Sequence, residues 1–311
     1  MNKYKGVVFF DYDGTTVDEV DEIKTATPTT VESLNKLKEN GYLTMLCSGR
    51  TQRFLEMDID KFMGAITCNG SHTEVEGEVI RDICIPDELV FQVVNEYFPR
   101  DTIIHFETRD ISYYLHMDEE FFKNHCKLFN LPQRWYAPWK FRTKNTHISK
   151  LVMNYKDIQV KKDFEEEFKD VFTCAKHVRE NFIDITLKGV TKGDAITELI
   201  EKLGIDKKDT YAFGDADNDV EMMQAVGTGI AMGRHSEKVG EVASMVTGIL
   251  NIRPSLFLKN GEVNVSGLCR TRKKSVANVF ESCKKYFTSR NIDPNTYDIS
   301  VASATTPDEC D

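Results

Sequence analysis

Long apolar runs are missing from this sequence of 311 residues. The run from Gly6 to Phe10 meets charge within a few residues, whereas a membrane span needs roughly 18 to 20 apolar residues. We therefore expect no transmembrane helix. The first residues also lack the apolar stretch of a signal peptide, because Asp11 and Asp13 come too early. We expect a cytoplasmic protein.

Closely spaced cysteines are missing as well. The 8 cysteines include no C-x-x-C pair, and no histidine stands beside them at zinc-finger spacing. In a chain without a signal peptide, this pattern predicts reduced thiols that serve as small core residues. The sequence also contains no internal repeat and no low-complexity tract.

The chain has no excess of basic residues. It carries 40 Lys plus Arg against 50 Asp plus Glu, a formal net charge of −10. We expect neither nucleic acid nor an anionic membrane as a partner, since no global positive field would attract them. The rest of the composition is typical of globular proteins, and the length predicts two or more folded units.

Apolar runs that end in polar residues predict a parallel sheet. The candidate strands are residues 5–10, 42–48 and 209–215. A helix capped by Thr29 or Thr30 and ended by Gly41 separates the first two, and an amphipathic helix over 194–203 precedes the third. This order predicts an α/β fold with a doubly wound, Rossmann-like parallel-sheet core.

The middle of the chain has a different character. Residues 82–182 hold both tryptophans and combine a helical period with strand-like segments such as TIIHFET, which predicts an inserted α+β domain. We assign 1–81 and 183–248 to the core. Residues 249–311 have strand-like runs around Asn260-Gly261 and then a helical pattern, which predicts a short α/β extension.

Two carboxylates, Asp11 and Asp13, follow the first predicted strand. Their spacing points both side chains the same way, so they can share one cation or one substrate. Gly14 permits a tight turn before Thr15, with backbone N–H groups that could cradle phosphate oxygens. The same residues also occur in solvated turns, so this motif alone does not establish a site.

Gly214 to Asp219, GDADND, places three carboxylates and one amide after another strand. Ligands of doubly wound sheets gather at the carboxyl ends of the strands, so this cluster would face Asp11. A hard cation such as Mg²⁺ would relieve the repulsion. A calcium EF-hand does not fit, because the twelfth position counted from Asp215 is Val226 rather than Glu.

Further phosphate contacts are expected from two other segments. Ser48, Gly49 and Arg50 supply a hydroxyl, a backbone N–H and a cation after the second strand, and Lys192 follows Thr191 at the start of a helix. Each alone is more often a cap or a solvated lysine.

Taken in order, these segments resemble the four motifs of the haloacid dehalogenase superfamily of phosphotransfer hydrolases. DYDGT resembles the first motif, the Ser48 turn the second, Lys192 the third and GDADND the fourth. Only one helix and one strand fit between Asp11 and Ser48, whereas the interval from Ser48 to Lys192 holds the inserted domain. That placement, with Asn69-Gly70 before it, resembles the Cof-type subfamily and its large cap.

The resemblance implies a Mg²⁺-dependent phosphatase that acts on small phosphorylated metabolites, such as sugar phosphates, through an aspartyl phosphate. Asp11 would be the nucleophile and Asp13 the general acid and base. The implied metal-site residues are Asp11, Asp13 through its carbonyl, Asp215, and Asp219 through water or Lys192. The implied phosphate contacts are Gly14, Thr15, Ser48, Gly49, Lys192 and Asn218. Arg50 would contact substrate or pair with a carboxylate.

The cap would select the substrate by closing over the site. The candidate contacts are His105, Arg134, Trp135, Tyr136 and Trp139. The alternative is that these residues form the cap core or its surface, since buried aromatic side chains are the commoner case.

Residues 249–293 resemble part of the DegV-family fatty-acid-binding proteins, through Leu250–Pro254 and Arg270–Lys274. The front half of such a protein is absent, so a complete lipid pocket is not expected. The sequence leaves two alternatives to the phosphatase. One is a fatty-acid-binding or regulatory fusion protein, and the other is a phosphomutase that shares the aspartyl phosphate.

Overall fold

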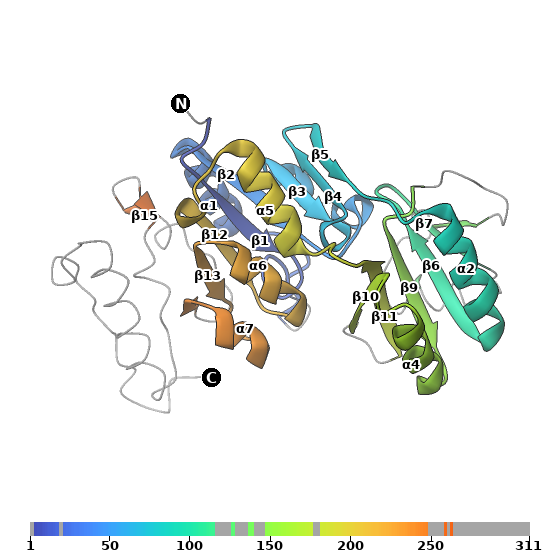
Figure 1. Ribbon diagram of the computed structural model, residues 1–311. Coiled ribbons are helices and arrows are strands. Elements are labelled where there is room, and N and C mark those ends of the chain that lie inside the picture. The colour runs from blue at the N-terminus through green and yellow to red at the C-terminus, as the bar shows by residue number, and fades with distance from the viewer. Residues whose placement is uncertain are drawn as a thin grey trace.

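The computed structural model describes residues 3–18, 21–115, 126–127, 136–139, 147–176, 181–247, 258–259 and 262–263. Apart from residues 258–259 and 262–263, they form two lobes, each built on its own sheet (Figure 1). The larger sheet has 8 strands in the order β14-β13-β12-β1-β2-β3-β4-β5, and the smaller has 6 in the order β10-β11-β9-β6-β7-β8.

The larger sheet is the predicted α/β core. Its strands are β1 (Gly6–Asp11), β2 (Tyr42–Cys47), β3 (Gly64–Thr67), β4 (His72–Val75), β5 (Glu78–Asp82), β12 (Thr210–Gly214), β13 (Thr228–Ala231) and β14 (Met245–Val246). All neighbours pair in parallel except β3 with β4 and β4 with β5. The carboxyl ends of β1, β2 and β12 therefore meet at one edge.

Helices cover both faces of this sheet. They are α1 (Pro28–Glu39), α5 (Lys192–Leu203), α6 (Val220–Ala225) and α7 (Glu237–Val242). Alternate residues of β1 point to opposite faces, so Phe10 packs in the cluster that contains Leu34 of α1, and Phe9 in the cluster that contains Leu199 of α5. This arrangement confirms the predicted doubly wound core.

The start of α1 and the end of α5 can be compared with the capping residues expected from the sequence. The N-cap of α1 is Thr27, whose side chain accepts from the Thr30 amide, and not Thr29 or Thr30 as expected. Proline at 28 explains the difference, because its fixed φ and missing N–H suit the first helical position. The predicted end of the helix over 194–203 is confirmed, since α5 ends at Leu203 and Gly204 caps it with a φ of 65°.

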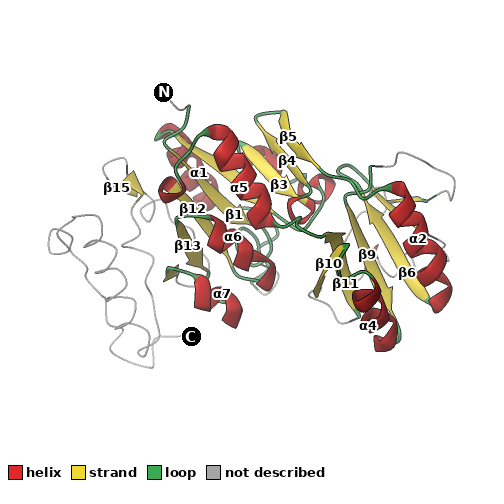
Figure 2. Cartoon of the chain, viewed as in Figure 1, coloured by secondary structure: helices red, strands yellow, loops and turns green. Residues whose placement is uncertain are grey.

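The second lobe is a mixed sheet with helices on one face (Figure 2). Its elements are α2 (Asp87–Tyr97), β6 (Thr102–Glu107), β7 (Ser112–Tyr114), β8 (Tyr136–Pro138), β9 (Lys150–Tyr155), α4 (Ile158–Glu167), β10 (Phe172–Lys176) and β11 (Phe182–Leu187). Ile104 and Phe106 of β6 pack with α2 and α4 in one apolar cluster. Their neighbours His105 and Glu107 therefore lie on the opposite face of the sheet.

The boundary between the lobes differs from the predicted one. β11 pairs with β9 and β10, so residues 183–187, which we assigned to the core, lie in the second sheet. A change in composition cannot show which sheet a strand joins, because that depends on pairing partners distant in sequence. Only residues 188–191 then connect this sheet to α5.

Four described residues of the C-terminal extension form the strand pair expected around Asn260-Gly261. β15 (Leu258–Lys259) pairs antiparallel with β16 (Glu262–Val263). The other residues of the DegV-like stretch lie outside the described part of the chain.

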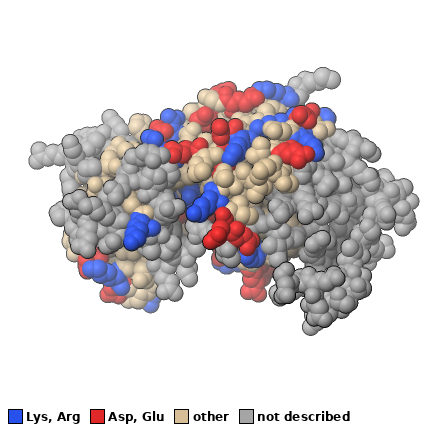
Figure 3. All heavy atoms as spheres, turned by 180° about the vertical axis from the view of Figure 1, so that it is seen from behind, with Lys and Arg blue, Asp and Glu red and all other residues tan. Residues whose placement is uncertain are grey.

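Within the described part, no helix has both the length and the apolar character needed to cross a membrane. Figure 3 shows acidic and basic side chains intermingled among the described residues on one face of the molecule.

Candidate active site

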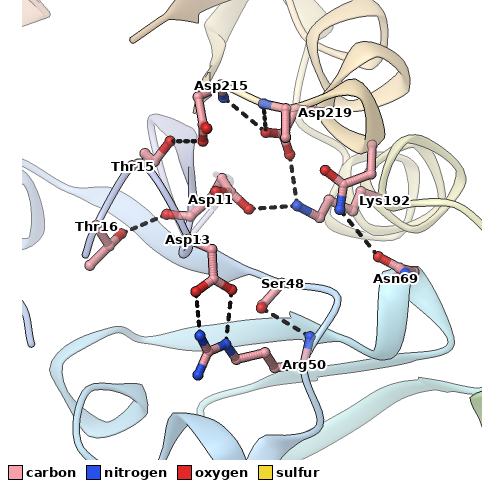
Figure 4. Close-up of polar contacts among 12 residues, drawn as sticks. Asp11, Asp13, Thr15, Thr16, Ser48, Arg50, Asn69, Lys192, Asp215 and Asp219 are labelled. Carbon is pink, nitrogen blue, oxygen red and sulfur yellow. Dashed lines mark hydrogen bonds and ion pairs between the residues drawn. The ribbon is translucent and has the colours of Figure 1, made fainter. Parts of the chain in front are cut away.

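Asp11 is the last residue of β1 and lies at the centre of a cluster of charged side chains (Figure 4). Its side chain is almost fully buried, and its Oδ1 accepts a 2.6 Å hydrogen bond from Nζ of Lys192. Its Oδ2 is buried without a hydrogen-bond partner. One oxygen of this carboxylate is thus anchored, and the other is available to a ligand.

The loop after β1 fits closely against Asp215. Gly14 has a φ of +86°, and a Cβ there would lie 2.2 Å from Oδ2 of Asp215. The hydroxyl of Thr15 donates to Oδ1 of the same carboxylate at 3.1 Å. The Thr16 hydroxyl donates to the carbonyl of Asp11 at 2.6 Å, which fixes the turn. Glycine at 14 is therefore required by space as well as by conformation.

Asp219 and Lys192 form the rigid side of the cluster. Oδ2 of Asp219 accepts from the backbone amides of Asp215 and Ala216 at 2.9 and 3.0 Å. Its Oδ1 accepts from Nζ of Lys192 at 2.7 Å. Lys192 is the first residue of α5 and is 1% exposed, so its ammonium bridges Asp219 and Asp11 away from water.

The electrostatics of the cluster favour a bound cation. Burial, followed by the negative charge of Asp219, raises the pKa of Asp11 well above its ordinary value. The same two causes raise the pKa of Asp215 to about 7. Burial alone would lower the pKa of Lys192, but Asp11 and Asp219 raise it instead. Three carboxylates facing one ammonium leave a surplus of negative charge.

A hard divalent cation fits these donors. Asp11, Asp215 and Asp219 each offer a carboxylate oxygen, and these oxygens lie within 4.8 Å of one another. Because both oxygens of Asp219 already accept hydrogen bonds, Asp11 and Asp215 have the more available ones. All of these donors are carboxylate oxygens, and Oδ2 of Asp11 is buried without a hydrogen-bond partner. Such a set of oxygen donors suits Mg²⁺.

Asp13 lies apart from this carboxylate cluster. Its Oδ2 accepts from Nε of Arg50 at 2.8 Å, and its Oδ1 accepts from the same guanidinium. That guanidinium also lies over the ring of Tyr12, 5.3 Å from its centroid. Of the two roles that the sequence left open for Arg50, the structure shows pairing with a carboxylate.

The second motif forms a tight turn at the end of β2. Ser48 is buried, and its Oγ accepts from the Arg50 amide at 3.0 Å. A Cβ on Gly49 would lie 2.7 Å from Oδ1 of Asn69. Asn218 Nδ2 is 3.5 Å from that same Asn69 oxygen. The Ser48 turn and GDADND are thus brought together through Asn69.

A family model of haloacid dehalogenase-like hydrolases matches residues 8–251. The chain belongs to the haloacid dehalogenase-like hydrolases. It is 29% identical to the candidate phosphatase YkrA of Bacillus subtilis over 78% of this chain and 91% of YkrA. It is 25% identical to the pyridoxal phosphate phosphatase YbhA of Escherichia coli over 78% and 93% of the two chains. The solved structure of a subclass IIB sugar phosphatase of the superfamily shares its fold, with a TM-score of 0.66, 24% identity and coverage of 78% and 93%.

The cap of this haloacid dehalogenase-like hydrolase separates the predicted contacts. Trp139 belongs to the cap core and stacks on Phe106 with centroids 4.4 Å apart. His105 lies on the other face of the sheet, 6.1 Å from the ring of Tyr136. Tyr136 reaches the core lobe, 5.9 Å from the ring of Phe54. Arg134 and Trp135 lie outside the described residues.

Two residues near the site were not predicted to belong to it. Asn69, with a φ of 55°, was noted only as part of a family segment. The dipeptide Asn69-Gly70 is a signal in the sequence for such a backbone position, because asparagine adopts a positive φ more readily than most residues. Lys150 of the cap donates to the carbonyl of Gly49 at 2.9 Å. Nothing in its local sequence marks it, because its partners are distant along the chain.

Proposed function

We propose that this haloacid dehalogenase-like hydrolase is a Mg²⁺-dependent phosphatase that acts on small phosphorylated metabolites through an aspartyl phosphate on Asp11. The observation that carries the proposal is the asymmetry of this carboxylate. Lys192 holds one of its oxygens, and the other is buried, unpartnered and next to Asp215. The named phosphatases among its relatives support the same class of enzyme.

In the first step, an oxygen of Asp11 forms a bond to phosphorus while the bond from phosphorus to the leaving alcohol oxygen breaks. Asp13 gives its proton to that oxygen. In the second step, Asp13 takes a proton from water, the water oxygen bonds to phosphorus, and the bond to Asp11 breaks. The products are the alcohol and inorganic phosphate, and Asp11 is regenerated.

The surrounding residues hold the reacting groups in place. Lys192 fixes the direction of the Asp11 carboxylate, and Ser48, Gly49 and Asn218 would contact the phosphoryl oxygens. Both oxygens of Asp13 accept hydrogen bonds from Arg50, so at least one of these bonds must break before that carboxyl group can contact the leaving oxygen.

A Mg²⁺ ion would be held by Asp11 and Asp215, with the carbonyl of Asp13 and water as further ligands. When bound, it screens the repulsion between a carboxylate nucleophile and an anionic phosphate. Asp219 would act at a distance, because its own oxygens hold Lys192 and two backbone amides. Gly14 and Thr15 keep Asp215 in position. Their amides donate to the carbonyls of Val17 and Tyr12 at 2.8 and 3.4 Å, so they would contact the phosphate only after giving up these bonds.

Two observations support the proposed substrate class, namely the polar face of the cap and the substrates named for two relatives. The cap face opposite its helices carries the polar residues His105, Glu107 and Lys150, which are buried, with Glu107 paired to Lys150 at 2.9 Å. A polar face of this kind favours a polar leaving group over an apolar one. The names of the relatives include a pyridoxal phosphate and a sugar phosphatase. A small polar phosphomonoester is therefore the substrate class that we propose.

The test compares two variants of the fourth motif with the nucleophile variant. Release of phosphate from a chromogenic aryl phosphate is measured with and without Mg²⁺. We expect Asp11→Asn to lower kcat by about 10³-fold or more, and Asp215→Asn to weaken the response to Mg²⁺. Asp217→Asn is the matched control, because Asp217 is exposed and pairs with Lys238 at 2.7 Å. Unchanged turnover in Asp11→Asn would refute the proposal.

The two alternatives stay predictions with their own tests. Analysis of products from sugar bisphosphates by phosphorus NMR would distinguish phosphomutase transfer from hydrolysis. A fatty acid bound by the DegV-like stretch would be found by extracting the purified full chain and identifying any acyl chain by mass spectrometry. The structure describes only residues 258–259 and 262–263 of that stretch.

A further inference from the structure

Three metal-ligating side chains come together where the cap meets the core, away from the carboxylates of the active site. Asp82 ends β5 of the core sheet, Cys84 lies two residues later in the link to α2, and His147 precedes β9 of the cap. One ligand atom from each lies within 4.8 Å of the other two. Sγ of Cys84 and Nδ1 of His147 are 3.7 Å apart.

Hydrogen bonds to the main chain hold the backbone next to Cys84 and next to His147. The amide of Ile85 donates to the carbonyl of Ile148 at 2.7 Å, which joins the link to the segment after His147. The Ser71 hydroxyl donates to the carbonyl of Ser149 at 3.0 Å, and the Ile83 amide donates to the carbonyl of Ser71 at 2.8 Å. Cys84 and His147 are therefore held as neighbours by main-chain bonds that do not involve their own side chains.

A buried histidine supports the carboxylate of the group. His72 is directly opposite Asp82 in the pairing of β4 with β5 and is 1% exposed. Its Nδ1 lies 3.3 Å from Oδ1 of Asp82. Carboxylates that bind metals are commonly oriented by such a hydrogen-bonded neighbour. Cys84 and His147 reach the surface, which leaves a path for an ion to enter.

We propose that Asp82, Cys84 and His147 form a binding site for a divalent ion with the preferences of Zn²⁺, with water in the fourth position. One sulfur, one imidazole nitrogen and one oxygen are the donors that Zn²⁺ accepts, at about 2.0 to 2.3 Å from the ion. Small side-chain rotations bring the three atoms within that reach. Mg²⁺ prefers oxygen donors. Because this site has a thiol and an imidazole, it should prefer a different metal from the active site.

The bound ion would join the end of a core strand to the cap. Asp82 belongs to the core sheet and His147 to the cap, so the ion would link the two lobes beside the connection at Cys84. Binding displaces the proton of the Cys84 thiol, because a thiolate is the form that ligates metal.

The test uses Co²⁺ as a spectroscopic probe of the full chain in excess Mg²⁺. A thiolate bound to Co²⁺ gives a charge-transfer absorption band that carboxylates cannot give. We expect one equivalent of Co²⁺ to produce this band and Zn²⁺ to remove it by displacement. Cys84→Ser should abolish the band, His147→Gln should weaken Co²⁺ binding about 10-fold or more, and Asp11→Asn should leave it intact.

The matched control is Cys174→Ser, because Cys174 is also partly buried and lies in β10 of the cap outside the cluster. It should keep the band. Absence of a thiolate band in the wild type, or an equal band in Cys84→Ser, would overturn the proposal. The absorption needs no turnover, so this result does not depend on whether the chain is a phosphatase.

Discussion

Lys150 is a buried cation on which the stability of the cap should depend. It begins β9 and is 4% exposed. Its Nζ lies 2.9 Å from Oε2 of Glu107 and 3.4 Å from Oδ2 of Asp184, and it donates to the carbonyl of Gly49. Removing this ammonium would leave the buried carboxylate of Glu107 and the partly buried one of Asp184 without the cation that they share.

The perturbation is Lys150→Met, which keeps an unbranched side chain and removes the charge. Breaking a buried ion pair by removing one partner costs about 3 to 5 kcal/mol, because the other charge stays desolvated. The matched control is Lys156→Met. Lys156 follows the same strand and pairs with Asp101 at 2.7 Å, but their side chains are 71% and 73% exposed. An exposed pair of this kind contributes about 0 to 1 kcal/mol.

The penalty in Lys150→Met should depend on pH with a definite sign. Burial raises the pKa of Glu107, and Lys150 opposes the rise, so the variant raises that pKa further. A carboxyl group with a higher pKa in the folded state binds more protons folded than unfolded. The penalty should therefore shrink as the pH falls from about 8 to about 5. Adding Glu107→Gln should recover part of the lost stability.

The assay is equilibrium denaturation in urea followed by tryptophan fluorescence. Both tryptophans, Trp135 and Trp139, lie in the predicted cap segment, and Trp139 stacks on Phe106 in the cap core, so the signal reports the cap. The reasoning is refuted if Lys150→Met loses no more stability than Lys156→Met, or if its penalty grows as the pH falls.

Two further predictions concern the core lobe. Gly14→Ala places a methyl group against Asp215 and should lower kcat/KM by about 10²-fold in a phosphate-release assay, whereas Gly77→Ala, at a similar φ but in open space, should keep full activity. Burial would raise the pKa of Asp58, but four hydrogen bonds lower it below its ordinary value, so Asp58→Asn should lose about 1 to 3 kcal/mol at neutral pH. Thermal melts should show the difference from wild type starting to shrink near pH 4 and being lost as the pH falls through the lower folded-state pKa.

The parts of the site that could be predicted from the sequence are those with a local signal. Asp11, Ser48 and Asp215 each follow an apolar strand, and a parallel sheet brings such strand ends to one edge. The order of the predicted strands and helices then indicated a doubly wound parallel-sheet core. Lys192 could be placed because it follows Thr191 at the predicted start of a helix. The amphipathic pattern began that helix at Asp194, whereas the structure begins it at Lys192 itself.

The parts that could not be predicted depend on pairing across long stretches of sequence. Strand 182–187 could not be assigned to the cap sheet, because only its pairing with β9 and β10 places it there. Lys150 meets Gly49 across 101 positions, and Cys84 meets His147 across 63. No zinc-finger spacing marks the second pair, because its two residues converge through the fold and not through a short motif.

The contacts of Asp219 explain how the acidic cluster leaves one oxygen of Asp11 without a hydrogen-bond donor. Two backbone amides and the Lys192 ammonium satisfy both oxygens of Asp219, so this residue is fixed and its charge is partly neutralised. The same ammonium reaches only Oδ1 of Asp11, and Oδ2 is left without a donor. A donor on Oδ2 would have to be displaced before that oxygen could attack phosphorus. Lys192 therefore orients the proposed nucleophile without blocking it, and the remaining negative charge falls where a divalent cation can neutralise it.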